Sequence, residues 1–213
     1  MRVISLNVGG PREVEWRGDV VLTSIFKSAV NGRRPVSAVN VDGDQQSDLT
    51  VHGGVEKAVY AYPSEHYAYW RGELPEAALP WGAFGDNLTV EGLLENDVRI
   101  GDRYRIGTVE VVVSQPRVPC FKLGIRFGRA DMVKRFLHSG RSGFYFAVAT
   151  PGELGAGDAI EPLARGDAAL TVAVIAGLYA GAIDDPALMR RASQSAALPE
   201  GWREGFRRRL AAG

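Results

Sequence analysis

Residues 108–123 read Thr-Val-Glu-Val-Val-Val-Ser-Gln-Pro-Arg-Val-Pro-Cys-Phe-Lys-Leu. The first part of this stretch is rich in β-branched residues, which is typical of a strand, and it is the strongest strand pattern in the chain. Pro116 and Pro119 then fix their own φ angles and restrict the residues before them, which favours a stiff, extended loop. The stretch therefore predicts a strand that ends in a rigid loop presenting Cys120.

Short β-rich runs of this kind, punctuated by glycine, recur over residues 1–165. They lie at residues 2–8, 20–27, 36–41, 57–62, 88–90, 102–106, 108–114, 144–150 and 159–163. Arg17-Gly18-Asp19 and Ile106-Gly107-Thr108 predict tight hairpin turns, because glycine supplies the positive φ that such turns need. Helical patterns occur only near residues 63–72 and 130–138. We therefore predict a mainly β fold with covering helices, either a barrel or a sandwich.

The composition changes after Gly166, where the chain becomes rich in alanine. Three helical segments are predicted, at residues 171–180, 186–195 and 199–211, with start signals at Thr171, Asp185-Pro186 and Pro199-Glu200. The sequence therefore predicts two domains, residues 1–165 and a small three-helix domain at 166–213. These helices could cover the sheet, dock a partner, or build a homodimer, and amphipathic patterns alone do not distinguish these roles.

The charge balance limits the classes of partner. Lys and Arg together number 25, as do Asp and Glu, and the pI is about 6.8, so there is no basic excess for nucleic acid or acidic membranes. One cysteine permits no internal disulfide, and the N-terminus lacks the pattern of a cleaved signal. The most apolar stretch falls short of the ~18 residues that span a bilayer. We expect a cytoplasmic protein with no membrane segment.

Cys120 is the first candidate for chemistry. Arg117 and Lys122 place positive charge within a few residues of its sulfur, and nearby cations lower the pKa of a thiol. The thiolate is both a nucleophile and a soft metal ligand. The competing interpretation is that a lone cysteine is a small buried hydrophobic residue.

Two further segments could bind an anion. His52-Gly53-Gly54 brings adjacent glycines between two strand-like runs, where backbone N–H groups can approach a ligand, and Lys57 adds a charge for a phosphate. Lys27 and Arg33 flank a second glycine turn. On spacing alone, an ordinary glycine turn explains the first pattern better, and solvated loop charges are the commoner explanation of the second. His52 could also act as the base of a Cys120–His52 pair, since such pairs form across a fold.

Several sequence blocks resemble, in their order and in their residues, the MOSC domain family, which is named for the C-terminal domain of molybdenum cofactor sulfurases. The resemblance is to the YiiM-like branch of that family in particular. The blocks are Phe26-Lys27-Ser28-Ala29-Val30 with Gly32-Arg33, Gly43-Asp44-Gln45 with Asp48, Val51-His52-Gly53-Gly54, Lys57-Ala58-Val59-Tyr60, Phe84-Gly85-Asp86-Asn87-Leu88-Thr89, Ile100-Gly101-Asp102 and Gln115 through Leu123. The predicted three-helix tail also resembles that branch. Asp86 stands where a glutamate is more usual in the family.

This resemblance implies a β-barrel core, a mononuclear molybdenum cofactor and the reduction of N-hydroxylated compounds. The Cys120 sulfur would ligate molybdenum together with a pterin dithiolene. The resemblance implies cofactor-binding roles for Lys27, Arg33, His52, Gly53, Gly54, Lys57, Asn87 and Arg117. His52 or Lys122 would assist protonation of the departing oxygen.

Reduction needs two electrons, and the chain has no flavin or nicotinamide fingerprint and no cysteine set for an iron–sulfur cluster. A separate redox protein is therefore expected to supply the electrons. Two other functions stay open at this point: a persulfide carrier or cofactor-handling protein that uses Cys120, and a non-catalytic small-molecule-binding module.

Overall fold

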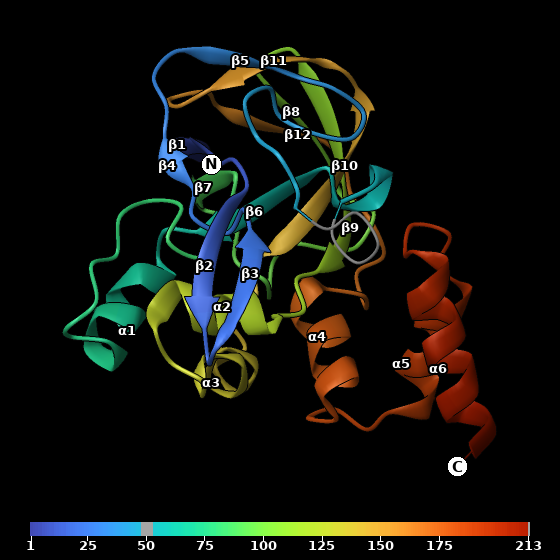
Figure 1. Cartoon of the computed structure of the whole chain (residues 1–213). Helices are drawn as coiled ribbons and strands as arrows, with labels where there is room; N and C mark the ends of the chain where they lie inside the picture. The colour runs from blue at the N-terminus through green and yellow to red at the C-terminus, as the bar shows by residue number, and fades with distance from the viewer. Residues whose placement is uncertain (48–52, 213) are drawn as a thin grey trace.

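The central element of the fold is a mixed sheet of eight strands in the order β12-β8-β9-β10-β6-β7-β1-β4 (Figure 1). The computed structural model describes residues 1–47 and 53–212. The strands are β1 (Arg2–Val8), β4 (Ser28–Ala29), β6 (Val59–Pro63), β7 (Leu88–Glu91), β8 (Arg103–Ile106), β9 (Val109–Pro116), β10 (Phe144–Thr150) and β12 (Ile160–Ala164). Neighbours pair antiparallel except β6 and β7. Two small antiparallel ribbons complete the β structure: β2 (Arg12–Trp16) with β3 (Asp19–Thr23), and β5 (Arg33–Val36) with β11 (Gly152–Gly155).

The start of β1 also contacts the segment that leads into β12. Arg2 forms an isolated bridge with Ala159, and the Val3 N–H donates to the Asp158 carbonyl at 2.9 Å. This pairing is local, so β12 and β4 remain the two ends of the strand order. The mixed sheet confirms the mainly β prediction, whereas the closed barrel stays a prediction.

The two predicted hairpin turns are present. Arg17 and Gly18 join β2 to β3 with φ angles of 56° and 90°, and Gly107 joins β8 to β9 with a φ of 60°. The predicted strand at residues 36–41 is wrong, because the strand there is β5 and the chain turns after Val36. The Ser37 N–H donates to the Asn40 carbonyl at 2.8 Å, which closes this turn.

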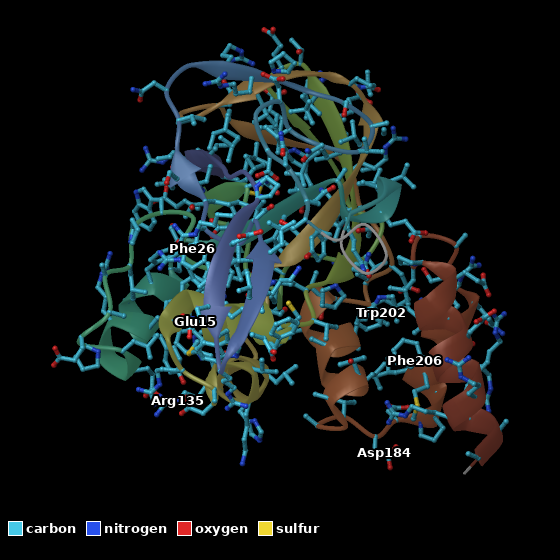
Figure 2. The ribbon with its side chains drawn as sticks, in the orientation of Figure 1. Glu15, Phe26, Arg135, Asp184, Trp202 and Phe206 are labelled. Carbon is cyan, nitrogen blue, oxygen red and sulfur yellow. The ribbon has the colours of Figure 1, made fainter. Side chains whose placement is uncertain are left out.

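The C-terminal part forms the three predicted helices, α4 (Val172–Ala180), α5 (Pro186–Gln194) and α6 (Glu200–Ala212). The Thr171 side chain caps α4 and the Asp185 side chain caps α5. Figure 2 shows Trp202 and Phe206 on the side of α6 that faces α4. Buried residues of all three helices belong to the same hydrophobic cluster as the sheet. The division at residues 165/166 stays a prediction. No helix in the described parts is both long and apolar enough to cross a membrane.

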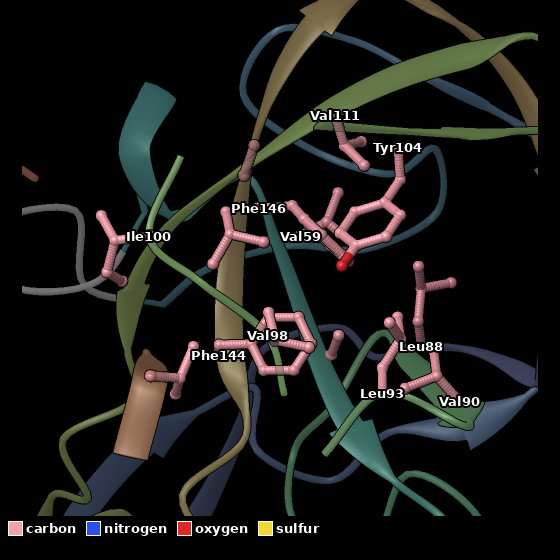
Figure 3. Packing of buried hydrophobic residues seen from close by; sticks show 14 of the residues in the cluster. Val59, Leu88, Val90, Leu93, Val98, Ile100, Tyr104, Val111, Phe144 and Phe146 are labelled. Carbon is pink, nitrogen blue, oxygen red and sulfur yellow. The ribbon is translucent and has the colours of Figure 1, made fainter. Parts of the chain in front are cut away.

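The two faces of β6 and β10 bury different side chains, because successive residues of a strand point to opposite faces. Val59, Phe144 and Phe146 enter the main hydrophobic core, which Figure 3 shows. Tyr60 lies on the other face, in a second cluster of buried residues, and Tyr145 packs against that cluster. This second face carries the candidate site.

Three helices cover the second face: α1 (His66–Glu73), α2 (Phe121–Phe127) and α3 (Met132–Ser139). Trp70 of α1 stacks on Phe136 of α3 with ring centroids 5.8 Å apart. The positions of α1 and α3 agree with the prediction. Helix α2 was not predicted, since seven residues containing Gly124 are too few to show a helical period. It begins directly after Cys120, so the rigid loop is shorter than expected.

Candidate functional site

Cys120 lies where two cavities meet. We call the first, of about 100 Å³, the charged cavity. Its lining includes Lys27, Asp44, Gly53, Lys57, Tyr60, Asn87, Arg117, Cys120, Lys122 and Tyr145. The second, of about 640 Å³, we call the aromatic cavity, and its lining includes Lys57, Gln115, Cys120, Tyr145, Tyr179, Trp202 and Phe206. The Cys120 side chain, which is partly exposed, therefore faces a narrow compartment and a wider one that is lined by several aromatic rings.

The chain around Cys120 is held at both ends. The backbone N–H of Arg117 donates to the Gly143 carbonyl at 3.3 Å, which ties the loop to the residue before β10. The Cys120 carbonyl accepts from the Leu123 N–H at 3.0 Å in the first turn of α2. Pro119 stiffens the residues between these bonds, and Pro116 at the end of β9 directly precedes them. The expectation of a rigidly presented cysteine agrees with this geometry.

Lys57 is positioned by side chains of β9. Gly53 and Gly54 both have positive φ angles, of 96° and 85°, and lead into a single helical turn at Val55–Lys57. The Glu56 carbonyl in that turn accepts from Ser114 Oγ at 2.6 Å and from Gln115 Nε2 at 3.2 Å. Because Lys57 follows Glu56, the strand that leads to Cys120 also fixes the backbone that carries Lys57.

Arg117 is a buried cation, with only 7% of its surface exposed. Its guanidinium lies 5.0 Å from the centre of the Tyr60 ring and 5.2 Å from that of Phe136. Burial alone lowers the pKa of Arg117, but the acidic groups of Tyr60, Tyr145 and Cys120 together raise that pKa above its usual value. Arg117 is therefore permanently charged and favours the anionic form of the nearby sulfur. Within the described residues its Nη1 atom has no hydrogen-bond partner.

Lys27 and Asn87 line the charged cavity, but other residues of the fold already bind them. Lys27 Nζ forms a close ion pair with Asp44, and burial lowers the pKa of Lys27 although Asp44 opposes the shift. Asn87 Nδ2 donates to Asp44 Oδ2 at 2.9 Å, and Asn87 Oδ1 accepts from the Tyr60 N–H at 3.1 Å. The predicted cofactor-binding role of these two residues must therefore compete with an existing network.

The remaining predicted residues are Lys122, Arg33, Gly54 and His52. Lys122 is buried in α2 and lines the charged cavity. Arg33 does not reach either cavity: it lies in β5, where Nη1 pairs with Asp158 at 2.7 Å and Nη2 donates to the Glu153 carbonyl at 2.7 Å. Gly54 lies beside Gly53 but outside the lining. His52 lies outside the described residues.

Three residues of the site had no role in the sequence analysis: Tyr145, Gln115 and Trp202. Tyr145 could have been found from strand alternation, because it stands between two core phenylalanines and must point to the opposite face. Gln115 was visible only as part of the proline loop. Trp202 gave no signal beyond an amphipathic helix, since its approach to Cys120 depends on how α6 packs.

The charge of the cavity differs from that of the whole chain. Four cations, Lys27, Lys57, Arg117 and Lys122, line the charged cavity against one described carboxylate, Asp44. The chain as a whole has no net charge. The positive charge is therefore concentrated locally, and this arrangement suits a phosphate or another compact anion next to a thiol.

Asp86, between two residues that line the charged cavity, is fully buried. Its Oδ2 accepts from Thr89 Oγ1 at 2.7 Å, and its Oδ1 has no partner among the described residues. Burial raises the pKa of this carboxyl. The folded state therefore holds an extra proton between the unfolded pKa, near 3.9, and the raised folded pKa.

Asp86→Asn is expected to raise the free energy of unfolding at pH 7 by about 1–3 kcal/mol, because it removes a buried, incompletely bonded charge. The contribution of Asp86 to wild-type stability should fall as pH rises above about 4, and the variant should lack that contribution. Urea unfolding between pH 4 and 8 measures both effects. An equal pH dependence in the two proteins would contradict the buried charge.

A mixed sheet with a cysteine loop beside a cationic cavity, followed by three C-terminal helices, defines the class of protein. The family model for the MOSC domain matches residues 48–161, and the model for the YiiM-like 3-alpha helix domain matches residues 170–213. The chain belongs to the MOSC domain family.

Particular relatives support this assignment over the full length. The chain is 40% identical to the uncharacterized protein YflK of Bacillus subtilis, over 96% of this chain and 92% of that protein. The crystal structure of YiiM from Geobacillus stearothermophilus superposes with a TM-score of 0.82 at 37% identity, covering 98% of each chain. YiiM from Escherichia coli gives a TM-score of 0.80 at 30% identity, over 100% of this chain and 94% of that one. A Gibberella moniliformis protein named "Reductase" is 38% identical over 151 residues, which are 70% of this chain and 27% of that protein.

Proposed function

We propose that this protein binds a molybdenum cofactor through Cys120 and reduces N-hydroxylated bases or related N-oxygenated compounds. The observation that carries the proposal is the position of Cys120, a thiol at the junction between a cationic cavity and an aromatic one. The cationic cavity fits the phosphate end of a pterin cofactor, and the aromatic cavity fits an organic substrate. Membership of the MOSC domain family and the name of the fungal relative agree with a reductase.

The residues present fit such a cofactor. The described residues contain no group of three or more His, Cys, Asp or Glu side chains that could hold a metal ion. A metal at Cys120 would therefore depend on a single protein thiolate and on an organic ligand that brings further donors. Arg117 Nη1, which has no hydrogen-bond partner among the described residues, can donate to an anionic group of that ligand. Lys57 and Lys122 would supply further positive charge.

The reaction consumes R–NH–OH, two electrons and two protons, and yields R–NH2 and water. When bound, the cofactor would supply the two-electron chemistry at the N–O bond. The residues of the chain would hold the cofactor and supply a proton. Cys120 would hold the metal, Arg117 and Lys57 would fix the anionic end, and the Lys122 ammonium would donate a proton to the departing oxygen. His52 stays a second candidate for that proton.

The electrons would come from a separate redox protein, because the chain carries no flavin, nicotinamide or iron–sulfur motif. The fungal relative is consistent with electrons that come from outside this chain, because the match covers only 27% of that longer protein. Turnover of the isolated protein would require a chemical reductant such as reduced methyl viologen.

The first test is the molybdenum content of protein made in cells that synthesise the cofactor. We expect near-stoichiometric molybdenum in the wild type, at least a ten-fold loss in Cys120→Ser, and a marked loss in Lys57→Gln. Arg33→Gln is the matched control, because it removes a cation that lies outside both cavities, and it should retain the metal. A wild type without molybdenum would reject the reductase and favour a persulfide carrier, which a mass shift of one sulfur atom on Cys120 would reveal.

A further inference from the structure

The aromatic cavity is lined by residues of the sheet region and of the C-terminal helices. Tyr145 of β10 and Cys120 form its wall on the sheet side, and Trp202 and Phe206 of α6 form the opposite wall, with Tyr179 of α4 beside them. Figure 2 places Trp202 between α6 and the body of the molecule. The C-terminal helices therefore contribute most of the aromatic surface that faces Cys120.

Trp202 is held in a fixed orientation by the sheet. Its Nε1 donates to Gln115 Oε1 at 2.6 Å, and Gln115 Nε2 in turn donates to the Glu56 carbonyl at 3.2 Å. Gln115 is buried on β9, five residues before Cys120. The indole also contacts the Tyr179 ring at a centroid distance of 5.2 Å. One hydrogen bond thus links the orientation of the indole to the strand that presents the cysteine.

The position of Trp202 in the cavity lining points to binding as well as packing. Trp202 packs against the main hydrophobic core, yet it stays partly exposed and lines the cavity that contains Cys120. An oriented indole offers a flat π surface on which a planar ring can stack, and such stacking tolerates different bases because every base has a π face.

We propose that Trp202 is a specificity-determining residue, which selects planar heteroaromatic substrates by stacking them beside Cys120. The C-terminal helices, and not the sheet, then decide between aromatic and aliphatic N-hydroxylated compounds. This inference rests on the proposed function for its catalytic consequence, although the stacking itself does not need the cofactor. Base–aromatic stacking corresponds to roughly 5- to 150-fold in affinity, and an aliphatic substrate gains none of it.

The kinetic test compares Trp202→Leu with Trp202→Phe, using N6-hydroxyadenine and N-hydroxyurea as substrates and reduced methyl viologen as reductant. Trp202→Leu should raise KM for N6-hydroxyadenine by roughly 10- to 100-fold at a similar kcat, and should leave kcat/KM for N-hydroxyurea unchanged. Trp202→Phe keeps an aromatic face and should retain most of the preference. Equal losses for both substrates, or no loss for either, would overturn the proposal.

Binding of adenine to the cofactor-free protein, measured by calorimetry, separates this inference from the proposed function. Adenine should bind the wild type and Trp202→Phe but bind Trp202→Leu at least ten-fold more weakly. Trp16→Leu is the matched control, because Trp16 is also a partly exposed tryptophan but lines neither cavity. Trp202-dependent binding without molybdenum would leave the stacking site intact while the reductase failed. Binding that ignores Trp202 in a molybdenum-loaded, active enzyme would reject the stacking site alone.

Discussion

Asp44→Asn is expected to lower the free energy of unfolding by about 3–5 kcal/mol, the cost of leaving a buried charge without its partner. The Asp44 side chain is 1% exposed and that of Lys27 is 9% exposed, so water replaces little of the lost interaction. Asp44 also accepts from the Gly9 N–H at 2.8 Å and from Asn87 Nδ2 at 2.9 Å. An asparagine would turn an amide donor toward one of these donors. Urea unfolding at pH 7 measures the loss.

Asp42→Asn provides the control, since the Asp42 side chain is 62% exposed and should tolerate the change within about 0.5 kcal/mol. The double variant Lys27→Met, Asp44→Asn removes both charges but keeps an acceptor for one of the two donors, so it should recover part of the loss. A loss below about 1 kcal/mol in Asp44→Asn would mean that Lys27 is not held by this pair and is available to a ligand.

The network around Asp44 also shows where sequence reasoning stopped. Lys27 and Asn87 were assigned to the cofactor because their types suit anion and pterin binding. Their contacts with Asp44 join residues 27, 44 and 87, which only the folded sheet brings together. The assignment of Arg33 to the cofactor failed for the same reason, because its partner Asp158 lies 125 residues further along the chain. A pattern identifies a cation, but only tertiary structure shows which acid has already bound it.

Local sequence patterns predicted the strands and helices better than the contacts between them. The bounds of β1 and β10 were predicted to the residue, and the C-terminal helices to within a residue, because alternation and caps act over a few positions. Cys120, Arg117 and Lys122 could be placed together because they are neighbours in sequence. The aromatic cavity could not be predicted, since Lys57, Tyr145 and Trp202 meet there only through packing.

Arg117→Met is expected to separate function from stability. The guanidinium is buried, and its Nη1 has no partner in the part of the chain that the structure describes. The folded protein therefore bears a desolvation cost that the contacts with the Tyr60 and Phe136 rings offset only in part. Methionine fills a similar volume without the charge, and the free energy of unfolding should change by no more than about 1 kcal/mol. Molybdenum content should fall at least ten-fold, because a charge-assisted hydrogen bond to an anion contributes about 1.5–3 kcal/mol.

Arg117→Lys tests the geometry of the same interaction. Lysine keeps the charge but loses the planar fork that can contact two rings and an anion together, so molybdenum content should be intermediate. Metal analysis and urea unfolding on the same preparations compare the two effects directly. If Arg117→Met unfolded easily but retained its molybdenum, the residue would be a packing element of the aromatic cluster. If it lost the metal and kept its stability, the buried charge would be maintained for the ligand, because nothing in the fold requires it.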